Sequence, residues 1–232
     1  MNFKVDFQKS KNIMNEISCG YFSVWRQISM LRESIENAQS LQESNTHAVC
    51  LGIKCVQEAL FYASVTEINS WFIDSKDNVA SLHYVISKLK DVHFSKSLEA
   101  WYSKPPDTVS INQSDIENPK FWHQDYIASK KVEFQSKKDV ILHKYEQFST
   151  ANATKRVSAL RNKHVAHKDF KNNELYKPSE NAHKFSDTES VLKLLDDFIF
   201  DLNHLFNKST YLEHPSNFDS ACKDYWNSLK ST

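Results

Sequence analysis

The stretch that decides the fold class is residues 186–206, SDTESVLKLLDDFIFDLNHLF. Its apolar residues recur at spacings of three and four with polar residues between them: Val191, Leu194, Leu195, Phe198, Leu202, Leu205 and Phe206. This period places them on one face of an α-helix. Ser186 and Glu189, which are three residues apart, fit a capping box. The stretch therefore predicts an amphipathic helix that begins near Ser186.

The remainder of the chain repeats this helical pattern. Glycine occurs only at positions 20 and 52, and the five prolines stand at 105, 106, 119, 178 and 215. Strand-and-turn proteins seldom have so few turn residues. Further helices are predicted over 7–44, 46–72, 79–89, 94–104, 119–148, 152–166 and 215–229. We therefore expect an all-α fold, an up-and-down helical bundle with additional short helices.

The first two long helices are predicted to form an antiparallel hairpin, because the turn between them is short. Asn45 and Thr46 offer a cap for the second helix. That helix carries an apolar stripe of the bundle type, formed by Val49, Ile53, Val56, Leu60 and Ala63. Gly20 interrupts the first helix without a proline, which indicates a bend or a close helix crossing there.

A single helical domain is expected over residues 1–232. Apolar residues make up 40% of the chain and aromatic residues 12%, which is enough material for a packed core. The segment 105–119 is polar and bounded by prolines, so we predict a loop or an insertion. Asn118 and Pro119 then form a start signal for the next helix.

Charge, cysteines and hydropathy together indicate a cytoplasmic protein. The formal net charge is zero, so a nucleic-acid partner would have to bind a local patch. The four cysteines have neither zinc-site nor redox spacing, and we expect reduced thiols. The N-terminus lacks the apolar core of a signal peptide, and no apolar run approaches membrane-spanning length, so no membrane partner is expected.

A basic stretch precedes the helix of residues 186–206. Residues 160–169, LRNKHVAHKD, hold an arginine, an amide, two histidines and two lysines. No acidic residue occurs between Glu146 and Asp169. The basic side chains of this region are Lys155, Arg156, Arg161, Lys163 and Lys168. Such a local cationic patch suits an anionic phosphodiester.

Each of these side chains also has a structural interpretation. His164 continues the apolar stripe of its helix and fits a hydrogen-bonded core histidine. His167, at the expected helix end, could bind the last carbonyls. Arg161 could pair with Asp196 or Asp197. On an ideal helix, Arg161 and His167 border the buried face from opposite sides, about 9 Å apart along the axis.

Taken together, the same residue types suit cleavage of RNA without a metal. This reaction needs a group that takes the proton from the ribose 2′-hydroxyl, a cation beside the phosphorane, and a polar side chain that fixes the geometry. Histidine titrates in the range that proton transfer requires. Arginine binds phosphate through two parallel hydrogen bonds. An amide next to the arginine can orient it.

The pattern Arg161-Asn162-x4-His167 resembles the signature of the HEPN superfamily, in which four to six residues separate the arginine from the histidine. The longer sequence of residues 160–169 is similar to the AbiU-type abortive-infection branch of this superfamily. The resemblance, which lies mainly in the C-terminal half, implies a helical bundle that dimerises. Two motifs would then meet at the dimer cleft as a metal-independent endoribonuclease site. Arg161 would stabilise phosphate, Asn162 would orient the site, and His167 would act as acid or base.

The resemblance also implies partners for the chain. We expect RNA to be bound by side chains around the motif: Lys155, Arg156, Lys163, His164 and Lys168. A homodimer is expected, with an antitoxin protein as a candidate partner, in phage defence or a toxin–antitoxin pair. Some HEPN proteins are not nucleases. The alternative is therefore a non-catalytic helical module that binds RNA or a protein through the same basic patch.

Other chemistries have no matching pattern in the sequence. His164 and His167 could share a metal, but no His-Glu-x-x-His or Glu-x-x-His pairing completes a site, so we expect no metal. Two isolated glycines cannot form a phosphate-binding loop. No serine or cysteine stands in a triad signature. We therefore expect no cofactor.

Overall fold

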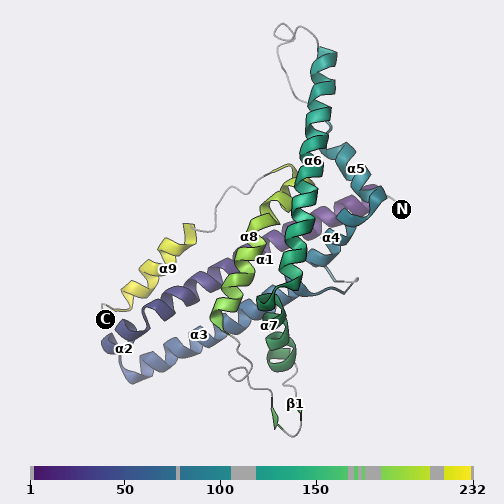
Figure 1. The fold of residues 1–232 in the computed structure, drawn as a ribbon. Helices are drawn as coiled ribbons and strands as arrows, with labels where there is room; N and C mark the ends of the chain where they lie inside the picture. The colour runs from purple at the N-terminus through teal and green to yellow at the C-terminus, as the bar shows by residue number, and fades with distance from the viewer. Residues whose placement is uncertain are drawn as a thin grey trace.

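The computed structural model describes residues 3–76, 79–105, 119–166, 170–171, 174–175, 184–209 and 217–230. In these ranges the chain forms helices, their connections and one short β-ladder, so the predicted all-α fold is confirmed (Figure 1). The ladder pairs β1 (Phe170–Lys171) with β2 (Glu174–Leu175) in antiparallel register. The single domain remains a prediction.

The helices follow the predicted order, with two departures in their type and bounds. They are α1 (Phe3–Glu36), α2 (Ala38–Ser44), α3 (His47–Ile68), η1 (Asn69–Ile73), α4 (Leu82–Lys90), α5 (Val92–Tyr102), α6 (Pro119–Thr150), α7 (Asn152–Leu160), η3 (Arg161–Ala166), α8 (Phe185–Asn207) and α9 (Asn217–Ser228). The first predicted helix is split at Asn37, and η1 and η3 are π-helices. Helix α6 begins at Pro119 as predicted, while residues 106–118 lie outside the described part of the chain.

Helices α1 and α3 pack as the predicted antiparallel hairpin. The Gln27 amide donates to Glu67 at 2.9 Å, and the Gln57 amide donates to Ser34 at 3.1 Å. A residue later in α1 thus contacts a residue earlier in α3, so the two helices run antiparallel. Thr46 caps α3 by accepting a hydrogen bond from the Val49 N–H at 3.4 Å, as the sequence predicts.

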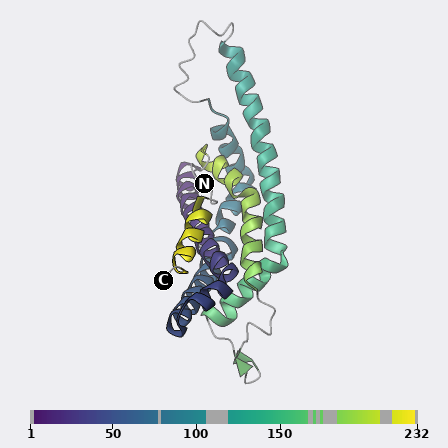
Figure 2. The same cartoon turned by 90° about the vertical axis from the view of Figure 1, so that its left-hand side faces the viewer.

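Helix α8 lies at the centre of the bundle and packs against α1, α6 and α7. The α8 side chains buried in this core are Val191, Leu192, Leu195, Phe198, Ile199, Leu202, Leu205 and Phe206. They largely match the stripe predicted from the sequence. Figure 2 shows α6 running beside α8 and extending beyond the other helices at one end. The amphipathic face of α8 thus organises the bundle.

The predicted capping box between Ser186 and Glu189 at the start of α8 is wrong. The helix begins at Phe185, and the Asp187 carboxylate accepts a hydrogen bond from the Lys184 N–H at 3.2 Å. Glu189 instead accepts a hydrogen bond from Arg32 at 2.7 Å. The acidic residue of the capping box is Asp187, so the N-cap is Lys184, two residues before the predicted Ser186.

The predicted apolar stripe of α3 is wrong in the N-terminal half of the helix. Val49 is 43% exposed and Val56 is 45% exposed, whereas the buried residues of α3 are Ser64, Val65 and Ile68. Helix α3 lies at an edge of the bundle, where α1 and α2 cover only one of its sides (Figure 1). The sequence period identifies an apolar face, but packing leaves part of that face uncovered.

Helix α3 and η1 also contradict the expectation about membrane-spanning length. Together they run over His47–Ile73, 27 residues, with a mean hydropathy of 1.4 in an 18-residue window that is 11% buried. By length and composition, this segment is long and apolar enough to cross a membrane. The cause is the row of small and apolar residues on the exposed side of α3.

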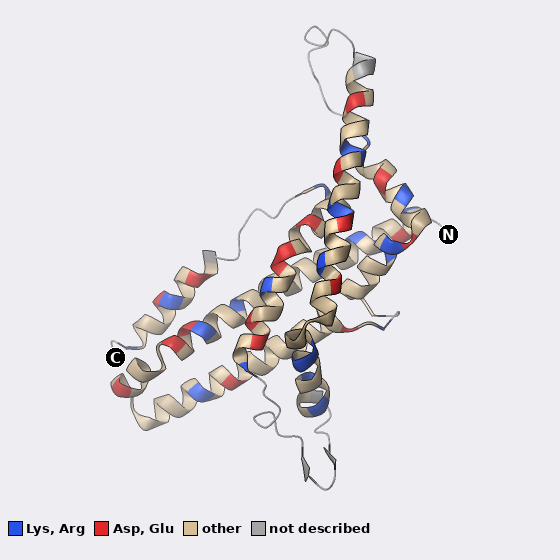
Figure 3. Cartoon of the chain, in the orientation of Figure 1, with Lys and Arg blue, Asp and Glu red and all other residues tan. Residues whose placement is uncertain are grey.

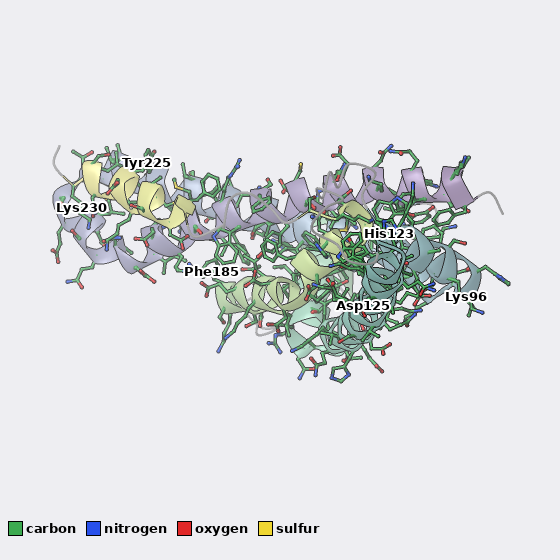
Figure 4. All side chains as sticks on the ribbon, turned by 90° about the horizontal axis from the view of Figure 1, so that it is seen from above. Lys96, His123, Asp125, Phe185, Tyr225 and Lys230 are labelled. Atoms are coloured by element: carbon green, nitrogen blue, oxygen red, sulfur yellow. The ribbon has the colours of Figure 1, made fainter. Side chains whose placement is uncertain are left out.

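The bundle is elongated, and its two ends are formed by different parts of the chain. Figure 4 places Tyr225 and Lys230, in and after α9, at one end, and Lys96 of α5 with His123 and Asp125 of α6 toward the other.

Helix α9 is fixed to α1 because the Trp226 indole donates a hydrogen bond to the Met30 carbonyl at 2.9 Å.

Gly20 marks a close crossing between α1 and η1, one of the two predicted alternatives. A Cβ atom at position 20 would lie 2.6 Å from Cδ1 of Trp71. At Gly52, by contrast, a Cβ would meet nothing within 4 Å. The two glycines of the chain are therefore a matched pair, one in a crowded contact and one in open space.

We predict that Gly20→Ala lowers the free energy of unfolding by about 1–3 kcal/mol, because the new methyl displaces the indole of Trp71. Gly52→Ala should leave it unchanged or raise it by up to about 1 kcal/mol through helix propensity. Urea unfolding measures both, at a concentration where all variants share one oligomeric state. Equal effects at the two positions would contradict the close crossing.

Candidate functional site

The basic stretch is positioned by α7, a short helix whose inner face is fixed in the core. Ala153, Thr154, Val157 and Leu160 are buried, and α7 contacts α3, α6, α8 and η1. Ala153, Val157 and Leu160 are the stripe residues that the sequence predicts for this helix. Their burial determines which side chains of the basic stretch face outward.

An ion pair fastens the outer side of α7 to the first turn of α8. The Arg156 guanidinium donates from Nε to Asp187 at 3.0 Å and from Nη2 to the other carboxylate oxygen at 2.5 Å. Asp187 is buried, at 5% exposure. The hydrogen bond to Asp187 raises the pKa of Arg156 above its usual range. Arg156 thus already has a bidentate carboxylate partner, and any phosphate would compete with it.

After Leu160 the backbone changes from an α-helix to the π-helix η3. The predicted helix over 152–166 therefore has the right extent but a different winding in its last part. The wider turn changes the directions of Arg161 and of the residues after it, so angles from an ideal α-helix do not apply. Single-turn π-helical segments are frequent at functional sites.

The first two residues of the motif contact each other at the start of η3. Nη1 of Arg161 donates to Oδ1 of Asn162 at 3.0 Å. The Asn162 amide in turn donates to Ser158 at 3.5 Å, a long hydrogen bond. Asn162 is exposed and Arg161 is half-buried. The amide and the guanidinium therefore orient each other, while the site role of Asn162 that the resemblance implies stays a prediction.

The structural alternative for Arg161, a pair with Asp196 or Asp197, is not observed. Asp196 accepts a hydrogen bond from Tyr21 at 2.7 Å, and Asp197 pairs with Lys144 at 3.7 Å. Within the described ranges, no carboxylate pairs with Arg161.

His164 contacts a residue far away in the sequence. Its Nε2 lies 3.3 Å from the Tyr62 hydroxyl of α3, and the two ring centroids are 5.7 Å apart. His164 is half-buried, and the next residue, Val165, packs against the core. The predicted hydrogen-bonded histidine is thus confirmed, at the margin of the core and not within it. Nothing in the sequence pattern indicated Tyr62.

The structure describes two of the three lysines of the patch. Lys155 and Lys163 are exposed on α7 and η3. Figure 3 colours basic and no acidic residues on α7 and η3. His167 and Lys168 lie outside the described residues. The structure therefore pairs Arg161 with Asn162 and His164 with Tyr62, and the position of His167 stays a prediction.

The described residues offer no ready metal centre. No group of three or more histidine, cysteine, aspartate or glutamate side chains is arranged to hold an ion in the part of the chain that the structure describes.

We predict that Arg156→Ala lowers the urea midpoint of unfolding, because it removes the guanidinium that pairs with the buried Asp187 carboxylate. Lys155→Ala, which removes an exposed neighbouring cation, should leave the midpoint unchanged and serves as the matched control. Equal midpoints for the two variants would show that the ion pair does not hold α7 to α8.

The comparison with protein families shows which family the chain belongs to. The family model HEPN AbiU2, described as AbiU2, matches residues 11–226. Neither the curated proteins nor the solved structures gave a significant match. The family match covers both halves of the chain, including the N-terminal helices where the sequence pattern alone indicated no resemblance. The chain belongs to the HEPN AbiU2 family, an abortive-infection type of HEPN domain.

Proposed function

We propose that this protein is a metal-independent endoribonuclease that acts as a homodimer in phage defence or a toxin–antitoxin system. The observation that carries the proposal is the Arg161 guanidinium. It is oriented by Asn162 at 3.0 Å and has no carboxylate partner among the described residues. An arginine held in this way is preorganised for the charge of a phosphorane.

The proposed reaction assigns one task to each side chain of the motif. His167 takes the proton from the 2′-hydroxyl, and the 2′-oxygen attacks phosphorus. Arg161 stabilises the charge on the phosphorane, while Asn162 keeps the guanidinium in place. The bond from phosphorus to the 5′-oxygen breaks, and the partner's His167 protonates that oxygen. The products carry a 2′,3′-cyclic phosphate and a 5′-hydroxyl.

The surrounding basic side chains would hold the RNA strand. Lys155 and Lys163 are exposed beside the motif, and Lys168 follows it in the sequence. Such contacts add affinity without sequence preference and weaken with salt. His164, which already contacts Tyr62, would line the edge of the site. We further propose a cytoplasmic location and an antitoxin protein as a regulator of the activity.

A second candidate is a non-catalytic module that binds RNA or a protein through the same patch. The observation that favours it is the engagement of patch residues within the chain. Arg156 is bound to Asp187, and His164 is bound to Tyr62. Residues that stabilise the fold in this way do not by themselves require turnover.

The two candidates predict different results with a mixed RNA pool in the presence of EDTA. The wild type should cleave the pool, and Arg161→Ala or His167→Ala should lower the rate about 100-fold or more. Arg161→Lys keeps the charge but loses the bidentate geometry, so it should restore only a small part of the rate. Denaturing gel electrophoresis measures the cleavage.

Two controls keep this experiment interpretable. His143→Ala removes an exposed histidine of α6 outside the motif and should cleave like the wild type. Circular dichroism should show the same helix content in all variants. Undiminished cleavage by folded His167→Ala would contradict the assigned roles. Absence of cleavage by the wild type, together with RNA binding that is lost in Arg161→Ala, would establish the binding module instead.

A further inference from the structure

A cavity that the proposed reaction does not use lies where η1, α4, α6 and α7 meet. Its volume is about 380 Å³, at the lower end of the range of small-molecule sites, about 300–1,000 Å³. The buried residues Phe72, Phe148 and Thr154 form its floor, and the exposed residues Ser75 and Ser149 stand at its mouth. We call it the α7 cavity. It reaches from solvent to the core of the bundle.

Thr154 brings to the α7 cavity a buried hydroxyl for which the described residues provide no partner. The residue is 3% exposed, and its Oγ1 forms no hydrogen bond. A threonine inside a helix often donates its hydroxyl to the carbonyl one turn earlier, as Thr66 does to Tyr62 at 2.8 Å. A buried polar atom without a partner is costly and calls for an explanation. Because Thr154 lines the cavity, a bound molecule can supply the partner.

His83 of α4 and Tyr145 of α6 form a polar pair in the wall of the same cavity. Nδ1 of His83 lies 3.2 Å from the Tyr145 hydroxyl. Burial raises the pKa of Tyr145, so its phenol keeps its proton. If Nδ1 accepts this hydrogen bond, Nε2 carries a proton that can be donated; if Nδ1 donates it, the hydroxyl proton is available. In both tautomers the pair can donate one hydrogen bond to a ligand and accept another.

The other walls of the α7 cavity are aromatic and carry no charge. Phe72 and Phe148 are 1% exposed, and the rings of Tyr145 and Phe148 have centroids 6.1 Å apart. Among the described residues, no lysine, arginine, aspartate or glutamate lines the cavity. Lys90 and Glu146, which have opposite charges, line a neighbouring hollow instead. A charged ligand would therefore lose its hydration without gaining a counter-ion, whereas a flat neutral ring would not.

We propose that the α7 cavity binds a small neutral aromatic molecule that both donates and accepts hydrogen bonds, in its simplest form an aromatic carboxamide. The ring would pack against Phe72, Tyr145 and Phe148. The amide N–H would donate to Oγ1 of Thr154, and the carbonyl would accept from the pair of His83 and Tyr145.

The proposal is independent of the proposed nuclease, because it concerns a second site. Thr154 precedes Arg161 by seven residues, about two helical turns. A molecule in the cavity would contact η1, α4 and α6 as well as α7, so it would strengthen the attachment of the helix that continues into η3. Binding should therefore raise the melting temperature of the chain.

Three probes that share one ring and differ in charge test the class of ligand. Benzamide is neutral, benzoate is an anion and benzylamine is a cation at neutral pH. In ligand-detected NMR titrations of the full chain, benzamide should bind about tenfold more tightly than either ion, because the cavity provides no counter-charge.

Thr154→Val tests the hydroxyl, since it keeps the shape of the side chain. It should weaken benzamide binding about tenfold and leave the urea midpoint unchanged or higher, because the lost hydroxyl has no partner in the described chain. Thr188→Val is the matched control. Thr188 is 1% exposed, but its hydroxyl donates to the Phe185 carbonyl at 2.6 Å. This variant should lower the midpoint and leave binding unchanged.

A second pair of variants tests the mouth of the cavity without changing the core. Ser149→Trp should abolish benzamide binding, because the indole closes the entrance. Thr150→Trp, at the exposed neighbour that does not line the cavity, should bind benzamide like the wild type.

Several results would overturn the proposal. They are absence of benzamide binding, equally tight binding of either ion, and binding that Thr154→Val or Ser149→Trp leaves unchanged. A midpoint that falls as far in Thr154→Val as in Thr188→Val would show that the Thr154 hydroxyl has a partner within the chain. None of these measurements involves RNA, so a failed nuclease leaves the cavity site standing, and a failed cavity site leaves the nuclease.

Discussion

The structure depends on the burial of one face of α8 against three other helices. The apolar side chains from Val191 to Phe206 contact α1, α6 and α7 at once, so α8 determines where each of them lies. Arg156 and Asp187 add a directional contact at the start of α8, where the basic stretch meets it. Helix α7 is thereby fixed on its apolar side by packing and on its polar side by an ion pair.

This double attachment explains how a short helix can present a site. Beyond Leu160 the winding loosens into η3, where Asn162 is exposed and Arg161 is half-buried, while Val165 still packs against the core. The guanidinium and the amide orient each other at 3.0 Å. Tyr62 reaches the same place from α3. The π-helix η3, which carries Arg161 and Asn162, therefore contacts both α7 and α3. It lies next to a face of α3 that the described chain leaves uncovered.

Much of the fold could be predicted from the sequence, because long amphipathic helices reveal their own period. Several confirmed features depend only on neighbours within a few residues. They are the apolar stripe of α8, the buried Ala153, Val157 and Leu160 of α7, the cap at Thr46 and the helix start at Pro119. Local sequence is sufficient for such features. The family resemblance, carried by residues 160–169, extends to residues 11–226 by the family match.

The parts that could not be predicted depend on partners far along the chain. Whether Val49 and Val56 are buried is decided by the number of helices around α3, which periodicity does not contain. The contact of Tyr62 with His164 joins residues 102 positions apart. The capping residue of α8 was missed because two acidic residues compete for that role and Arg32 binds one of them. The π-helix that begins at Arg161 is only six residues long, so its sequence shows no periodicity that would distinguish it from an α-helix.

The central claim is that Arg161 and His167 cleave RNA through its own 2′-hydroxyl. The most direct measurement is the chemistry of the ends formed when the wild type cuts RNA in EDTA. The account predicts 2′,3′-cyclic phosphates and 5′-hydroxyls, and no cutting where the nucleotide before the scissile bond carries 2′-deoxyribose. Cleavage that requires a divalent cation, or that leaves 3′-hydroxyl ends and 5′-phosphates, would contradict it.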